Sequence, residues 1–107
     1  MSLDVYLEHT QPVTVHHGNI THNLNRMAEE AGIYAALWRP EELGIERAEQ
    51  MIPLLNGGLA KLEADPAHFR TFDAPNGYGT YDNLVRFVRN YLSACREHPD
   101  ATVRACR

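Results

Sequence analysis

HHGNITHNL, residues 16–24, is the stretch that decides the fold, because an expected strand runs into an expected helix within it. It gathers three imidazoles, His16, His17 and His22, and two carboxamides, Asn19 and Asn23. Strand-to-helix junctions direct backbone N–H groups and side chains towards a common point, so small ligands often bind there. The stretch therefore predicts both the start of a helix, capped by a residue at 19–21, and a candidate binding site.

The flanking sequence predicts three strands. Apolar and polar residues alternate along residues 2–8, which is the period of a half-buried strand. The alternation resumes at residues 13–16 after a turn expected at 9–12, so the chain should begin with a hairpin. Residues 101–106 alternate again. Strands at both ends of the chain indicate a three-stranded antiparallel sheet.

Between these strands, apolar residues recur at intervals of three and four, the period of a helix. Helices are expected from the junction to Gly32, over about residues 45–64, over 65–72 and over 80–98, with a shorter helical turn at 33–38. Pro53 lies inside the second of these, so we expect a kink or two abutting pieces there. The prediction is an α+β fold, a small antiparallel sheet of the N-terminal hairpin and the C-terminal strand packed against about four helices.

The composition fits one folded domain, residues 1–107, with 44% hydrophobic and 22% charged residues. No apolar run approaches the roughly 20 residues of a membrane span, and the N-terminus lacks the features of a signal peptide. The net charge of −4 argues against nucleic acid as a partner. Cys95 and Cys106 are too few for a disulfide framework, so we expect reduced, largely buried thiols and residence in the cytosol.

A longer pattern resembles a family of small proteins encoded by phages and prophages. The pattern is NITHNL (19–24), MA (27–28), AGIY (31–34), LWRP (37–40) and NGYG (76–79). The resemblance covers nearly the whole chain, although Tyr78 stands where tryptophan is expected in many relatives. It implies a phage-associated context in the cytosol of a host cell. It transfers no activity and no catalytic residue.

The loop NGYG, residues 76–79, precedes the last expected helix. Its glycines permit positive φ, a helix N-terminus accepts an anion, and an aromatic ring beside it can stack on a base. The competing interpretation is a left-handed turn and helix cap whose aromatic ring covers the core. The loop lacks the lysine of a phosphate-binding P-loop.

Arginine supplies the other candidate anion contacts, because its planar fork suits carboxylates and phosphates. Arg39 follows Trp38, and Arg107 ends the last strand. For the arginines of the last helix, pairs such as Arg86 with Asp82 on a solvated face are the more ordinary interpretation. The candidate ligand contacts are Asn19, His22, Asn23, Arg39, Asn76, Tyr78 and Arg107.

A metal site is an alternative use of the junction. His16 and His22 could converge on a divalent metal, since neutral imidazole is a common ligand. Their spacing fits no established metal motif, and simple helix capping by Asn19 or Thr21 explains the same residues. We therefore assign no cofactor.

The leading hypothesis is a non-catalytic protein that captures a small nucleotide-like or anionic ligand, or a host protein, through the junction and the glycine loop. One alternative is a small metal-dependent hydrolase or nuclease that uses His16 and His22. Another is a helical module that mediates oligomers. Neither an activated nucleophile nor paired carboxylates are visible in the sequence, which favours binding over catalysis.

Overall fold

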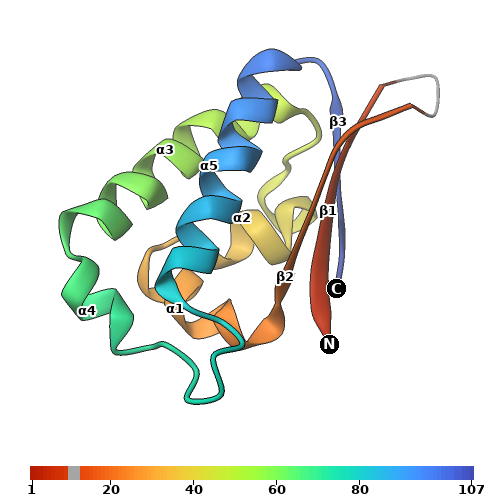
Figure 1. Cartoon of the computed structure of the whole chain (residues 1–107). Helices are drawn as coiled ribbons and strands as arrows, with labels where there is room; N and C mark the ends of the chain where they lie inside the picture. The colour runs from red at the N-terminus through yellow and green to blue at the C-terminus, as the bar shows by residue number, and fades with distance from the viewer. Residues whose placement is uncertain (10–12) are drawn as a thin grey trace.

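A computed structural model of the chain describes residues 1–9 and 13–107, so most of the turn expected at 9–12 lies outside the described residues. The α+β prediction is confirmed. A three-stranded antiparallel sheet stands on one side of the molecule, and the helices pack against one of its faces (Figure 1).

The strand order is β2-β1-β3, with β1 (Ser2–Glu8) at the centre. β2 (Thr14–Thr21) pairs antiparallel with one edge of β1, and β3 (Thr102–Cys106) pairs antiparallel with the other. The alternation in residues 2–8 decides which face is buried. Leu3, Val5 and Leu7 are fully buried against the helices, and the residues between them face the open side of the sheet.

The described helices are α1 (Asn25–Glu30), α2 (Tyr34–Trp38), α3 (Ala48–Ala64), α4 (Pro66–Arg70) and α5 (Tyr81–Glu97), with 3-10 turns η1 (His22–Leu24) and η2 (Pro40–Leu43). β2 continues through Thr21, the last of the predicted cap positions, and the helical turn η1 begins at His22 and leads directly into α1. Asn19 lies within the strand and caps nothing, whereas the Thr21 side chain accepts a hydrogen bond from Asn23 N.

The long helix α3 is not divided at Pro53, which lies exposed within one continuous helix. α3 begins at Ala48, later than residue 45, because the preceding segment pairs with β3: Glu46 O accepts from Val103 N (2.9 Å), and Arg47 forms a β-bridge with Thr102. Ala48 N donates to Ala101 O (2.9 Å) and Glu49 N donates to Pro99 O (3.0 Å), which fixes the start of the helix beside β3.

The core lies between the sheet and the pair α3 and α5. The inner face of α5 is apolar along its whole length, and the Tyr81 hydroxyl donates to Leu62 O of α3 (2.7 Å). Cys95 is buried in this core as expected. Cys106 is exposed, contrary to expectation, because its position in register with Asp4 puts it on the open face of the sheet. Among the described residues, no helix is long and apolar enough to cross a membrane.

Two adjacent glycines of α3 offer a matched test of this packing. A Cβ at Gly58 would lie 2.2 Å from Ile33 Cγ2, whereas a Cβ at Gly57 would meet nothing within 4 Å. Gly58→Ala should destabilise the protein by about 1–3 kcal/mol through overpacking. Gly57→Ala should stabilise it by about 0.5–1 kcal/mol through helix propensity. Urea unfolding measures both, and equal effects of the two substitutions would contradict this packing.

Candidate functional site

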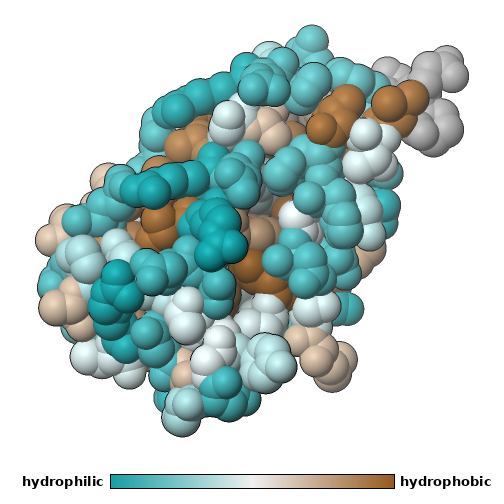
Figure 2. Space-filling view, viewed as in Figure 1, coloured by the Kyte–Doolittle hydropathy of each residue, from teal (hydrophilic) through white to brown (hydrophobic). Residues whose placement is uncertain are grey.

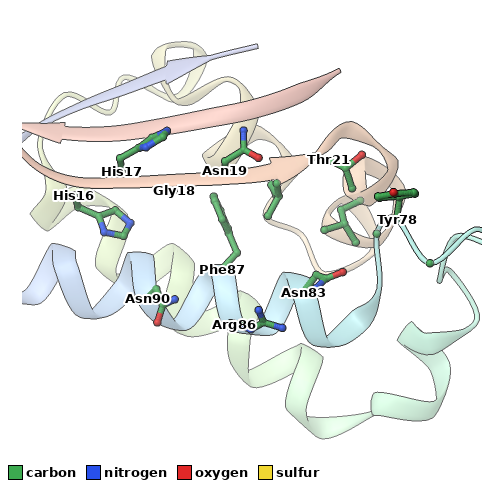
Figure 3. Close-up of a pocket in the computed structure, with 14 residues that line it drawn as sticks. His16, His17, Gly18, Asn19, Thr21, Tyr78, Asn83, Arg86, Phe87 and Asn90 are labelled. Atoms are coloured by element: carbon green, nitrogen blue, oxygen red, sulfur yellow. The ribbon is translucent and has the colours of Figure 1, made fainter.

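A cleft of about 390 Å³ lies between β2, the loop that joins α4 to α5, and α5 itself (Figure 3). In the space-filling view, apolar surface shows between the hydrophilic residues of α5 and those of β2 (Figure 2). The lining residues are 16–21 of β2, Leu24, Gly77, Tyr78 and Gly79 of the loop, and Asn83, Arg86, Phe87 and Asn90 of α5.

The predicted junction and the glycine loop do meet at this cleft. The Asn23 side chain donates to Tyr78 O (2.9 Å), which ties the loop to the end of β2. Gly79 has φ of +111°, a conformation that other residues rarely adopt, and a Cβ there would lie 3.0 Å from Asn23 Cβ. The glycine therefore lets the loop approach the junction closely.

The loop is a capped turn, not a cradle for an anion. Asn76 Oδ1 accepts from Tyr78 N (2.9 Å), and Tyr81 N at the start of α5 donates to Asp73 Oδ1 (2.7 Å). Asn83 N donates to Thr80 Oγ1 (3.3 Å). Side chains of the chain itself therefore already accept from the amides of Tyr81 and Asn83, two of the first amides of α5, which would otherwise be available to an anion. The Tyr78 ring is 71% exposed at the rim of the cleft and does not cover the core.

One wall of the cleft is the edge of the sheet. His22 N donates to Met1 O (3.3 Å), which makes these two residues a hydrogen-bonded pair of the antiparallel ladder. Hydrogen-bonded pairs alternate with pairs that share no bond, so Val5 and Gly18, four residues along each strand, also form one. The N–H and C=O groups of His17 and Asn19, the residues on either side of Gly18, therefore point away from β1, towards the cleft.

His17 and Asn19 are the residues whose main chain forms this wall. Their side chains point to the open face, where the Asn19 amide donates to Asp4 Oδ1 (2.9 Å) and Ser2 Oγ (3.0 Å) and His17 Nε2 lies 2.9 Å from Asp4 Oδ1. Asn19 was predicted to contact ligand through its side chain. In the structure that side chain is engaged with β1, and the main chain borders the cleft.

The opposite wall is a stripe of α5 whose residues other than Arg86 were not predicted from the sequence. Asn83, Arg86, Phe87 and Asn90 recur at intervals of three and four, so they share one side of the helix (Figure 3). That spacing was visible in the sequence. Only Arg86 was considered, as one of the arginines of a solvated face, because nothing local in the sequence shows that β2 lies beside this stripe.

The predicted pair of Arg86 with Asp82 does not form. Asp82 Oδ1 instead accepts from Arg70 Nη2 of α4 (3.1 Å). Within the described part of the chain, Arg86 has no ion pair and no side-chain hydrogen bond, and Asn90 likewise has no hydrogen bond. Arg86 therefore brings an unneutralised positive charge to the cleft.

Five predicted ligand contacts do not line the cleft: His22, Asn23, Arg39, Asn76 and Arg107. The side chains of Asn23 and Asn76 bond main-chain atoms of Tyr78, as described above. Arg39 pairs with Glu42 (3.1 Å), and Arg107 pairs with Glu41 and donates to Trp38 O (2.8 Å), so both guanidinium groups are held near η2. His22 packs beside the Trp38 ring at a centroid distance of 6.1 Å. Its Nε2 is buried and has no hydrogen-bond partner among the described residues.

The geometry offers no metal centre on the predicted ligands. His16 lies against Tyr91 of α5, with ring centroids 5.7 Å apart, whereas His22 lies against Trp38. Burial lowers the pKa of His16 below its ordinary value, so the ring is neutral at neutral pH. Over residues 1–9 and 13–107, no group of three or more His, Cys, Asp or Glu side chains is arranged to hold a metal ion.

No protein-family model, curated protein or solved structure matches this chain. The function is therefore argued from the geometry of the cleft.

The tether between the junction and the loop gives a testable prediction. Asn23→Ala removes the bond to Tyr78 O and should lower the free energy of unfolding by about 1 kcal/mol. Asn90→Ala, at an exposed site, should change it by less than about 0.5 kcal/mol. Urea unfolding measures both variants, and an unchanged Asn23→Ala protein would show that the tether contributes nothing to stability.

A second prediction concerns pH. The His17 ring and then the Asn19 amide hold the pKa of Asp4 below its ordinary value of 3.8. A carboxyl whose pKa is lowered by folding stabilises the protein at any pH above the pKa that it has in the unfolded chain. This contribution is lost as the pH falls through the lower pKa of the folded state. Asp4→Asn should therefore reduce stability at neutral pH and converge with the parent protein in acid. Thermal unfolding between pH 7 and pH 2 tests this, and a constant difference would contradict it.

Proposed function

We propose that this protein is a non-catalytic binding protein that captures an anionic ligand in the cleft between β2 and α5. The single observation that carries the proposal is the unpaired Arg86 on the cleft wall. A guanidinium group without an internal partner forms charge-assisted hydrogen bonds to a carboxylate or phosphate. The interpretation of Arg86 as part of a solvated, paired helix face required Asp82 as its partner. In the structure Asp82 pairs with Arg70 instead.

The surroundings of Arg86 suit such a ligand. Phe87, Ile20 and Leu24 give the cleft apolar surface, and the exposed Tyr78 ring stands at its rim, where it can stack on a planar group. Asn90 offers an amide that can donate and accept. A volume of about 390 Å³ lies in the range of small-ligand sites. The ligand is thus an anion joined to a flat or apolar body, from a nucleotide or from a partner protein.

The lining favours binding over chemistry. Its described residues include no Asp, Glu, Cys, Ser or Lys side chain, and its Thr21 hydroxyl is used as a cap. His16 is stacked on Tyr91. As a general base it would need an aliphatic hydroxyl or a thiol to activate, and the described residues of the lining offer none that is free. The resemblance to phage and prophage proteins adds the context in which we place this activity, capture of a molecule in the cytosol of a host cell.

NMR titration tests the proposal. We expect ADP, ADP-ribose, a cyclic dinucleotide or N-acetylglutamate amide to shift the amide signals of residues 16–21 and 83–90. Arg86→Gln should weaken the binding by about tenfold or more, which is the usual worth of a hydrogen bond to a charged group. Arg89→Gln is the matched control, because Arg89 lies on the same helix but pairs with Glu63 of α3.

The result is decisive in either direction. Shifts that map elsewhere, or that persist unchanged in Arg86→Gln, would place the binding outside the cleft. Failure of these anions and of the acidic peptides described below would remove the proposed function altogether.

A further inference from the structure

The two outer edges of the sheet are treated differently in this fold. On the β3 edge, Val103 N donates to Glu46 O (2.9 Å), and Arg47 forms a β-bridge with Thr102, so the segment before α3 covers that edge. On the β2 edge, no described group bonds the main-chain N–H or C=O of His17 or Asn19. The uncovered edge is the one that lines the cleft.

Residues 16–21 of β2 carry none of the features that usually protect an edge strand. Residues 16–21 contain no proline and no charged lysine or arginine, which are common devices against unwanted strand pairing. The register irregularity of the hairpin falls between Leu7 and Glu8, next to His16 at one end of the cleft, and the pairing with β1 is regular from His16 to Thr21. Exposed donors and acceptors at alternate residues are a template for another strand.

The facing wall has matching dimensions. Asn83 and Asn90 are seven residues apart in α5, a rise of about 10 Å. An extended chain covers the same distance in about three residues. A segment paired with the main chain of His17 and Asn19 would therefore run past Arg86 and span the distance from Asn83 to Asn90.

We propose that the cleft receives an extended segment of a partner protein, which adds as a fourth strand beside β2 and places one Asp or Glu carboxylate on Arg86. This inference rests on the proposed function and names the class of its ligand. Main-chain hydrogen bonds to His17 and Asn19 supply the affinity, and Arg86 supplies the selection for an acid. The chain carries a net charge of −4, so a run of acidic residues is repelled and a single carboxylate among uncharged residues is favoured.

Selection from a display library of random decapeptides on the full chain tests the inference. Enriched sequences should carry one acidic residue flanked by residues that favour extended structure. A synthetic peptide of the enriched sequence should lose about tenfold in affinity for Arg86→Gln and keep it for Arg89→Gln. N-methylation of the peptide amides that pair with β2 should cost about tenfold, while N-methylation of the alternate amides should cost little.

Hydrogen exchange supplies the readout on the protein side. Exchange of the His17 and Asn19 amides should slow when the peptide binds. The Gly18 amide, which already bonds to β1, should not change and serves as the internal control.

Three results would overturn the inference: no enriched peptide, peptides whose binding ignores N-methylation, or unchanged exchange at His17 and Asn19. If small anions still bind and still need Arg86, the proposed function stands and only the strand addition falls. Light scattering of the chain alone excludes one further occupant. A dimer whose His17 and Asn19 amides are already protected would show that a second copy of β2 takes the edge.

Discussion

The placement of α5 depends on the contact between Phe87 and Gly18. A Cβ at position 18 would lie 3.0 Å from Phe87 Cε2, so the missing side chain lets the ring rest directly on β2 (Figure 3). His16 stacks on Tyr91 one turn further along the helix. Together these contacts hold α5 under the edge strand and keep the hollow open beside it. A larger residue at 18 would move the helix and with it every polar group on the cleft wall.

The open face of the sheet shows how β2 is kept in register while its edge stays uncovered. The Tyr6 ring stacks on His17 (4.7 Å between centroids), and the Arg104 guanidinium lies 4.0 Å from the same ring. These three residues are cross-strand neighbours, one from each strand. Arg104 also forms a two-point ion pair with Glu8. This row joins all three strands without using any group that faces the cleft.

Much of the fold could be predicted from the sequence because the strands and helices show local periodicity of apolar residues. The alternation at residues 2–8 and the apolar stripe of α5 each predicted both an element and its buried face. The leading hypothesis used the junction and the Tyr78 loop as one site, and the hydrogen bond from the Asn23 side chain to Tyr78 O brings these two segments together. Asn83, Phe87 and Asn90 were missed because their role depends on which strand lies opposite, and no local pattern records strand order.

The arginines show the same limit from the side of electrostatics. Arg39 and Arg107 were candidates for an anion, but Glu42 and Glu41 are close enough in space to take both. Asp82 was the natural partner of Arg86 at a spacing of four residues, yet Arg70 from another helix reaches it. A sequence reveals which charges exist, whereas the folded backbone decides which of them remain unneutralised. Because Asp82 pairs with Arg70, Arg86 is left unneutralised, and this stretch of α5 becomes a candidate site instead of a solvated, paired face.

The pairing of β1 with β3 has a consequence for biosynthesis. Leu7 lies opposite Val103, so the central strand waits for its second neighbour until nearly a hundred intervening residues have been translated. Until then a nascent chain exposes unpaired main chain on both edges of the hairpin instead of one. Contacts of such long sequence separation also form slowly. Completion of the sheet is therefore a late step, and the growing polypeptide is most prone to self-association just before residues 102–106 emerge from the ribosome.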